Sequence, residues 1–524
     1  MRSGTSGLMG KRSNLVFGLT ISVLVVLYAG VFIARPEQLF ADDTYFYLQV
    51  AWNFARGMGS TFNTLMPTNG YHPLWMLLCA AVYTVLPSRI AGMYGVAVLI
   101  SVLDGLMLWT IRLLLKHVAG DLWVPAFAVL IPFSFVSQLG TEGALSGLFL
   151  ALVMLHAYAM TESPSLWTAM LFNLEAALAV LSRLDNIFII GFVWAAVWIE
   201  LTRKGERSGR GLQLAMFPIY AVLWGAYLGS NWIYFHTLQP ISGLLKSKSA
   251  VTHALKDHFP HTALFAMVLI LVCFTVIALR KRDMFFRVVE VPFLLGVIAH
   301  GTYIVLMMSS ETRWTWYYTS WILLGAVLLA RAGFVVLAPR RWLVTPIAAA
   351  LVLLLAWGWV KVSYMRSYLG ASLRPPQSFI DAVSRKSGIH NAFVFDEPGY
   401  VAYFTDLKII PLDGLMGDLA FQHDLATKGV NAVATKYQID GFIGPGEPFD
   451  KSSAKDHCDR LFLASVELHC EADGPGRWRV TSADVYSRVP GALAGRLQLN
   501  KDQIVWSEKD VLTVWRITPT VETR

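Results

Sequence analysis

Two adjacent carboxylates, Asp42 and Asp43, are the side chains of this sequence best placed to do chemistry. They follow a few residues after an apolar run from Leu15 to Ile33, where a membrane helix would have just left the lipid. A carboxylate in that place can deprotonate an acceptor hydroxyl, or hold a divalent cation such as Mg²⁺ or Mn²⁺. Asp is also favoured at the N-cap of a helix, where its charge stabilises the helix N-terminus. Both interpretations stay open for the pair.

The residues after the pair favour a binding role. An aromatic-rich stretch predicts an amphipathic helix that lies in the membrane interface, where the head group of a lipid-linked substrate would be presented. The loop that follows combines glycine turns, amides and aromatic rings, including Tyr71 and His72. This mixture suits sugar recognition, although it also suits any ordered loop.

Further polar residues stand at the ends of apolar runs. Glu142 is a single carboxylate between two such runs, and a charge at that depth is costly and is a functional candidate by default. Its alternative role is that of a carboxylate at a helix start. Arg183 and Asp185 close the next apolar hairpin, where they either pair with each other and anchor the membrane boundary or contact a substrate.

Cations and aromatic rings follow in two later loops. Lys246 and Lys248 lie on the side where positive residues are uncommon, and a lysine there suits a phosphate at the membrane surface. Arg313 stands among aromatic residues that include Trp316 and Tyr317, and its guanidinium could contact phosphate through two hydrogen bonds. A solvated loop lysine and an interfacial aromatic belt are the structural alternatives.

The composition predicts a polytopic α-helical membrane protein. The chain has 524 residues, a mean hydropathy of +0.52, 55% hydrophobic residues and only 15% charged residues. A chain this apolar must satisfy its backbone hydrogen bonds inside lipid. The net charge of +8 comes mainly from short clusters between apolar runs, which is typical of topology determinants and argues against a nucleic-acid partner.

The apolar runs predict about eleven transmembrane helices. The first, after Lys11 and Arg12, is too long for a signal-peptide core and is interpreted as an uncleaved span. Ten more of spanning length lie at about 90 to 115, 122 to 138, 143 to 160, 166 to 183, 187 to 200, 212 to 235, 262 to 280, 288 to 308, 318 to 338 and 343 to 362. The run from Pro73 to Leu86 is short for a hydrocarbon core of about 30 Å, so it suits a half-helix better than a full crossing.

The basic clusters predict the orientation. Four of them fall on one side, which is the cytoplasm by the positive-inside rule: Lys11/Arg12, Arg203 to Arg210, Arg280 to Arg282 and Arg340/Arg341. All the polar corners described above then lie outside. We expect residues 1–364 to form the transmembrane module, with a first external loop at 35–73, and residues 365–524 to form a soluble periplasmic domain.

The C-terminal part predicts an α/β domain. It starts near the linker Arg374-Pro375-Pro376, and about 150 residues suffice to bury a core. Ala392 to Phe395 and Lys408 to Pro411 predict short buried strands around a helical turn at Gly399 to Phe404. Cys458 and Cys470 could form a disulfide if this part faces an oxidising compartment.

Together these corners resemble the GT-C membrane glycosyltransferases, and the chain looks most like the bacterial branch that includes the mycobacterial terminal arabinofuranosyltransferases. The motifs that carry the resemblance span nearly the whole chain. They are Asp42-Asp43-Thr44-Tyr45, Gly70-Tyr71-His72-Pro73-Leu74-Trp75, Thr141-Glu142-Gly143, Arg183-Leu184-Asp185, Tyr234-Phe235 through Pro240 to Lys246, Trp316-Tyr317-Tyr318 and, in the tail, Gly399-Tyr400 and Ile409 to Leu415.

The resemblance implies transfer of a sugar from a polyprenyl-phosphate donor to an acceptor hydroxyl of a cell-envelope glycan or glycoprotein, with inversion. It implies a catalytic Asp in the first external loop, and we expect Asp42 to be the base and Asp43 to orient it or the acceptor. Lys246 and Arg313 would hold the donor phosphate, and Glu142 would contact the sugar or acceptor. His72 and Leu184 depart from residues common in relatives, which leaves the sugar open.

Two other functions compete with this hypothesis. A transporter or flippase of lipid-linked sugar would explain the many spans and Glu142. It would not explain a large outer domain, and no repeated halves are visible in the sequence. A membrane anchor whose function lies wholly in the tail would leave the acidic pair without a purpose. No cofactor is certain, and a divalent cation at the acidic pair is neither required nor excluded.

Overall fold

The computed structural model describes residues 36–119, 137, 139–246, 261–308, 315–337, 388–395, 398–447, 450–451, 458, 461–462, 465–488, 491–508 and 512–517. Several predictions concern residues outside these ranges: the first span, most of the run at 122 to 138, the run at 343 to 362, the proline linker, Lys248 and Arg313. The predicted count of eleven spans therefore remains a prediction.

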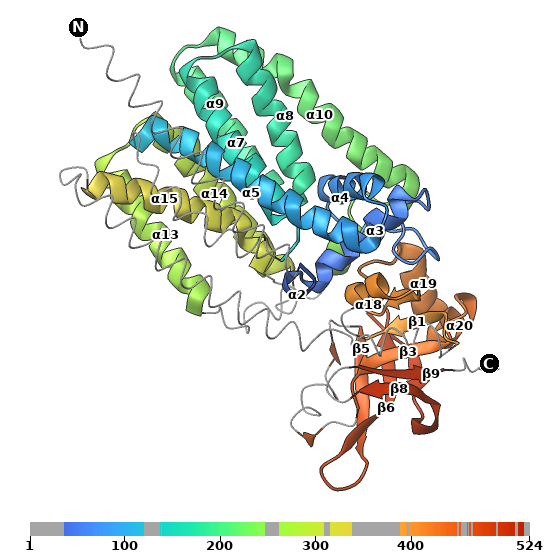
Figure 1. The fold of residues 1–524 in the computed structure, drawn as a ribbon. Coiled ribbons are helices and arrows are strands. Elements are labelled where there is room, and N and C mark those ends of the chain that lie inside the picture. The colour runs from blue at the N-terminus through green and yellow to red at the C-terminus, as the bar shows by residue number, and fades with distance from the viewer. Residues whose placement is uncertain are drawn as a thin grey trace.

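A bundle of long apolar helices forms the larger part of the chain (Figure 1). Six helices among the described residues are long and apolar enough to cross a membrane. They belong to α5 (Arg89–Ala119), α7 (Gly143–Glu162), α9 (Ile187–Arg203), α10 (Arg207–Phe235), α14 (Val291–Met307) and α15 (Thr319–Leu337). Two shorter apolar helices, α8 (Leu166–Ser182) and α13 (His261–Arg280), pack among them. The polytopic helical class is thus confirmed.

The short run after residue 72 forms α4 (Pro73–Val85). Its start lies beside α3 (Asp42–Ala55), where the backbone N–H of His72 donates to the Tyr47 hydroxyl at 3.4 Å. Its last turn lies beside the tail, where the Tyr83 and Tyr403 hydroxyls are 2.6 Å apart. With thirteen residues, α4 is short for a full crossing of a hydrocarbon core of about 30 Å, and the half-helix stays a prediction.

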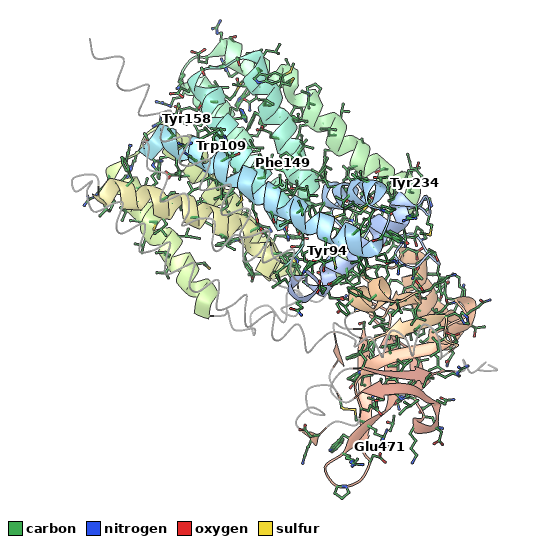
Figure 2. All side chains as sticks on the ribbon, in the orientation of Figure 1. Tyr94, Trp109, Phe149, Tyr158, Tyr234 and Glu471 are labelled. Carbon is green, nitrogen blue, oxygen red and sulfur yellow. A yellow bond between two sulfur atoms is a disulfide. The ribbon has the colours of Figure 1, made fainter. Side chains whose placement is uncertain are left out.

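The far end of the bundle gathers charged side chains. Arg287 and Arg203 both donate to the Glu200 carboxylate, at 2.9 and 2.7 Å. Arg331, which is fully buried, donates to Glu290 and Asp283 at 2.6 Å. These pairs join the basic clusters of the α9–α10 and α13–α14 connections at one end. Figure 2 shows Tyr158 toward that end and Tyr94 toward the end that meets the tail.

The tail forms two sheets (Figure 1), and its helices pack on both faces of the first one. The first sheet has the order β2-β1-β3-β9-β8, with β1 parallel to β2 and β3, and β9 antiparallel to β3. Its strands are β1 (Asn391–Val394), β2 (Lys408–Pro411), β3 (Gly441–Pro445), β8 (Ile504–Glu508) and β9 (Leu512–Arg516). Its helices are α18 (Pro398–Phe404), α19 (Leu419–Lys428) and α20 (Val430–Lys436). The two predicted strands and the helical turn between them are present where the sequence places them.

The second sheet is antiparallel, with the order β4-β5-β6-β7. It consists of β4 (Leu461–Phe462), β5 (Val466–Ala472), β6 (Trp478–Tyr486) and β7 (Leu493–Gln498). Cys470 on β5 is bonded to Cys458, twelve residues earlier. The disulfide therefore holds the segment before β4 against the sheet.

The tail packs directly on residues 36–73, the predicted first external segment. Tyr45 of α3 meets Tyr400 of α18 edge to face, with ring centroids 5.0 Å apart. The Asn63 side chain donates to the Ile409 carbonyl of β2 at 3.0 Å. Arg89 at the start of α5 donates to the Thr405 carbonyl at 3.0 Å. The tail and the site end of the bundle thus share one packed interface.

Candidate functional site

A pocket lies where the bundle meets the tail, and it encloses about 490 Å³ of empty space counted to its open mouth. Six separate segments of the chain contribute to the wall, so the tertiary fold assembles it. The lining residues are Asp43, Phe46, Tyr47, Gly70, Tyr71, His72, Thr141, Glu142, Pro240, Ser242, Lys246, Trp316, Tyr317, Leu415 and Met416.

The two adjacent aspartates have different surroundings. Asp43 lines the pocket, and its carboxylate accepts no hydrogen bond from any residue that the structure describes. Asp42 instead accepts the backbone N–H groups of Gly399 and Tyr400, at 3.1 and 2.6 Å, at the start of α18. The sequence led us to expect Asp42 as the base and Asp43 as the residue that orients it. In the structure Asp43 lines the pocket, whereas Asp42 joins the tail to α3.

Burial raises the pKa of the Asp43 carboxyl, and the negative charge of Glu142 raises it further. Lys246 acts in the opposite direction by stabilising the carboxylate. Asp43 thus lies near a cation, but its carboxylate accepts no hydrogen bond from the described residues. Burial without such hydrogen bonds increases the basicity of the carboxylate. This combination suits a group that must accept a proton.

Glu142 is held by three neighbours. Its carboxylate accepts from the Tyr47 hydroxyl at 2.9 Å and from the Arg183 guanidinium at 2.5 Å. The Nε2 atom of His72 lies 3.6 Å from the same carboxylate. Since both oxygens are engaged, Glu142 fixes the side chains around it, and its charge is compensated despite deep burial.

His72 is held in one orientation. Its Nδ1 accepts the backbone N–H of Leu184 at 3.2 Å, so a neutral ring carries its proton on Nε2, which faces Glu142. Burial lowers the pKa of His72, which outweighs the opposing effect of the Glu142 charge. We therefore treat His72 as a neutral imidazole in this wall.

Arg183 and Asp185 pair with each other, which is the first of the two roles that the sequence suggested for them. The guanidinium Nε lies 2.9 Å from an Asp185 oxygen, and Nε2 of His300 lies 2.8 Å from the other. The Arg183 guanidinium also lies over the Tyr317 ring, 4.3 Å from its centroid. Arg183 and Asp185 do not line the pocket themselves. They support Glu142 and Tyr317, which do.

A cation lies on another wall. Lys246 is the last residue of α11 (Ile241–Lys246), and its Nζ donates to the Tyr317 hydroxyl at 3.1 Å. Ser242 lies one helical turn earlier and also lines the pocket. Residues four apart share a face of a helix, so α11 presents a hydroxyl and an ammonium together.

The remaining predicted residues have mixed positions. Trp316 lines the pocket and packs on Leu139. Tyr71 also lines it, with its hydroxyl bonded to that of Ser60. Arg313 lies outside the described residues, so its role stays a prediction.

The structure adds residues that the sequence reasoning missed. Leu415 and Met416 of the tail line the pocket, and the Leu415 carbonyl approaches Gly70 so closely that a Cβ there would lie 2.1 Å from it. Burial raises the pKa of the adjacent Asp413 to about 6. His300 is the other omission, although an ionisable residue inside a predicted span is a signal that could have found it.

The divalent cation expected at Asp42 and Asp43 stays a prediction. The Asp42 carboxylate accepts two N–H groups at the start of α18, whereas Asp43 lines the pocket. Within the described ranges, one group has ligands close enough for a metal: Glu467, His469 and Asp484 of the second sheet. Arg496 donates to both oxygens of Asp484 there, which makes that group an ion-pair network.

Comparison with solved structures identifies the fold. ArnT from Cupriavidus metallidurans bound to undecaprenyl phosphate aligns over 88% of this chain and 97% of that chain, with a TM-score of 0.50 and 13% identity. The fold is that of the GT-C glycosyltransferases. At this identity the GT-C likeness is a likeness of fold.

Other GT-C structures align more weakly. The Archaeoglobus fulgidus oligosaccharyltransferase tethered with an acceptor peptide aligns with a TM-score of 0.48 and 12% identity, over 82% of this chain and 69% of that chain. Arabinosyltransferase EmbB from Mycobacterium smegmatis aligns with a TM-score of 0.42 and 14% identity, over 60% and 30%. No protein-family model matches the sequence, and neither does any curated protein.

Proposed function

We propose that the protein is a membrane glycosyltransferase that moves a sugar from a polyprenyl-phosphate donor to an acceptor hydroxyl, with Asp43 as the general base. The observation that carries the proposal is a pocket at one end of a GT-C bundle that is lined by a carboxylate and a lysine that interact electrostatically. The carboxylate accepts no hydrogen bond from the residues that the structure describes. Transfer from a lipid phosphate needs a base and a cation close together.

The reaction is a single displacement. The acceptor oxygen attacks the anomeric carbon while its proton passes to Asp43. The bond from that carbon to the phosphate oxygen breaks, and its electron pair leaves with the polyprenyl phosphate. Attack opposite the leaving group inverts the anomeric centre.

Lys246 serves the leaving group. Its ammonium, with the Ser242 hydroxyl on the same face of α11, binds the phosphate and compensates the charge that develops as the bond breaks. The ArnT structure, which shares the fold, holds undecaprenyl phosphate, and this supports a donor of that class. The resemblance of the sequence motifs makes a pentofuranose such as arabinofuranose the proposed sugar, and a cell-envelope glycan or glycoprotein the proposed acceptor.

The site faces the outside of the inner membrane in this proposal. Arg203 and Arg287, from the two basic clusters that the structure describes, lie at the opposite end of the bundle, which the positive-inside rule assigns to the cytoplasm. The Cys458–Cys470 disulfide also supports an oxidising compartment for the tail. Transport of a lipid-linked sugar remains the second candidate, because Glu142 and Arg183 form a buried charged pair at the membrane boundary.

The two aspartates give a matched test. Asp43→Asn in the purified full chain should lower transfer from a radiolabelled polyprenyl-phosphate sugar by about a thousandfold, because the base is lost. Asp42→Asn keeps an acceptor oxygen for the N–H groups of α18 and should stay within about tenfold of wild type, with a lower thermal unfolding temperature.

Full activity of Asp43→Asn would remove the base assignment. If the wild-type chain turned over no polyprenyl-phosphate sugar yet moved one across proteoliposomes, the transport function would replace the proposed one.

A further inference from the structure

One buried hydroxyl in the pocket wall has no hydrogen-bond partner among the residues that the structure describes. Thr141 is 0% exposed, lines the pocket, and its Oγ1 makes no hydrogen bond to any residue that the structure describes. Buried polar groups are normally satisfied, so an exception in a binding pocket calls for an explanation. Other buried threonines follow the rule: the Thr161 hydroxyl donates to Tyr158 at 2.9 Å, and that of Thr405 to Val401 at 2.7 Å.

The backbone around Thr141 is held in place by its neighbours. The Leu139 carbonyl accepts both the Ala41 N–H, at 2.9 Å, and the Thr44 hydroxyl. Gly140 has a φ of +82°, and a Cβ there would lie 2.6 Å from the Phe40 ring. The corner is therefore locked against the start of α3, with Thr141 held in the wall.

The neighbours of Thr141 indicate what it binds. Glu142 next to it already engages Tyr47 and Arg183, so it does not take the Thr141 proton. Asp43 also lines the pocket and is negatively charged when it acts as a base. An anion placed beside these two carboxylates would be repelled, whereas a neutral hydroxyl can both donate to and accept from Thr141.

An aromatic ring completes this part of the wall. Trp316 packs on Leu139, two residues before Thr141, and lines the same pocket. Aromatic rings and single hydroxyls together suit a sugar, since the ring can pack on the C–H face while the hydroxyl fixes one O–H group. The phosphate has its own partners, Ser242 and Lys246, on a different element.

We propose that Thr141 Oγ1 hydrogen-bonds a hydroxyl of the sugar that is transferred, and so helps the pocket to distinguish sugar-bearing lipid from bare lipid phosphate. This inference rests on the proposed function and deepens it, because it names the part of the donor that the Thr141 wall recognises. Thr141 is a binding residue in this account and takes no part in proton transfer.

The test compares two lipids on the full chain in detergent. Undecaprenyl phosphate and undecaprenyl phosphoryl-arabinofuranose are titrated against wild type, Thr141→Val and Thr141→Ser. Thr141→Val keeps the branched shape and loses the hydroxyl, so it should weaken binding of the sugar-bearing lipid about tenfold. Binding of the bare lipid phosphate should not change. Thr141→Ser keeps the hydroxyl and should stay within about threefold of wild type for both lipids.

Thr161→Val is the matched control, because it removes a buried hydroxyl from the C-terminal end of α7, whereas Thr141 lies just before the N-terminal end of that helix. It should leave the ratio of the two affinities unchanged. If Thr141→Val does not fold, Thr141→Ala against Thr141→Ser gives the same comparison.

Three results would overturn the inference. Equal weakening of both lipids by Thr141→Val would place the hydroxyl on the phosphate, and unchanged binding of both lipids would remove it from recognition. The third result has two parts. Wild type would bind the arabinofuranose-bearing lipid no more tightly than bare lipid phosphate, and Thr141→Val would not change the binding of a hexopyranose-bearing lipid. If wild type bound none of these lipids, the proposed function itself would fail, which is a separate outcome.

Discussion

At the scale of single residues, helix geometry separates the roles of Asp42 and Asp43. Successive side chains on an α-helix point about 100° apart, so neighbours in the first turn of α3 cannot face the same partner. One faces the tail and caps α18, and the other faces the pocket. Two identical side chains in sequence thereby become a structural contact and a candidate base.

The surroundings of Asp43 predict the pH dependence of transfer. A base works when deprotonated, and burial raises the pKa of Asp43 above the ordinary aspartate value of 3.8. Activity should therefore fall on acidification at a higher pH than for an exposed aspartate. Lys246 lowers this pKa, so Lys246→Met should move the acid limb of kcat/KM to still higher pH, in addition to reducing the rate.

A pH profile of kcat/KM for wild type, Lys246→Met and Lys428→Met checks this. Lys428 pairs with Asp424 on the surface of the tail, so its loss should leave the limb in place. A limb that does not move in Lys246→Met, or moves to lower pH, would contradict the proposed charge coupling.

At the scale of elements, the first external segment and the tail close the pocket from two sides. Gly70 precedes α4 and lies against the loop after β2, where the Leu415 carbonyl leaves no room for a side chain. That loop also contributes Leu415 and Met416 to the wall. The close approach of two backbones therefore sets the width of the pocket at this point.

Gly70→Ala should widen the pocket and reduce transfer. Its Cβ would lie 2.1 Å from a backbone oxygen, so one of the two loops must shift. A displacement of this kind near reacting groups costs about a hundredfold in rate. Transfer assays on the purified variant measure the loss.

Gly225→Ala on α10 is the control, since a Cβ there meets nothing within 4 Å. It should keep wild-type activity and unfold at the same temperature or slightly higher, because alanine favours a helix over glycine. Wild-type activity in Gly70→Ala would show that the contact with the tail does not shape the site.

At the scale of the whole molecule, the chain is polarised along the bundle. The pocket and the tail lie at one end, and the Glu200, Arg203 and Arg287 cluster lies at the other. The proposed chemistry needs the first end outside, where the donor and the cell-envelope acceptor meet.

Thiol labelling in intact cells checks this orientation. Arg477→Cys is exposed in the β5–β6 hairpin, and Glu206→Cys is exposed between α9 and α10. A membrane-impermeant maleimide should label position 477 from outside and position 206 only after the membrane is permeabilised. The native Cys79 and Cys273 are buried and give a low background. The opposite pattern would place the pocket in the cytosol and exclude the proposed donor and acceptor.

The sequence alone was enough for the class of protein, most helices and the residue types of the site. Hydropathy predicts spans because lipid forces backbone hydrogen bonds to form within each helix. The polar residues between apolar runs could be recognised as candidates because a charge beside lipid is costly. Glu142, Lys246, Trp316 and Tyr317 do line one pocket. The short strands of the tail were visible as apolar runs.

Only the tertiary structure decided which aspartate faces the pocket, and which partners hold Glu142 and His72. The contribution of Leu415 and Met416 was also beyond the sequence, because they come from a segment more than 340 residues after Gly70, which they meet. Periodicity gives the face of one helix, but it does not say what packs on that face. Rotation about α3 and the docking of the tail are set by long-range packing, and local sequence does not encode them.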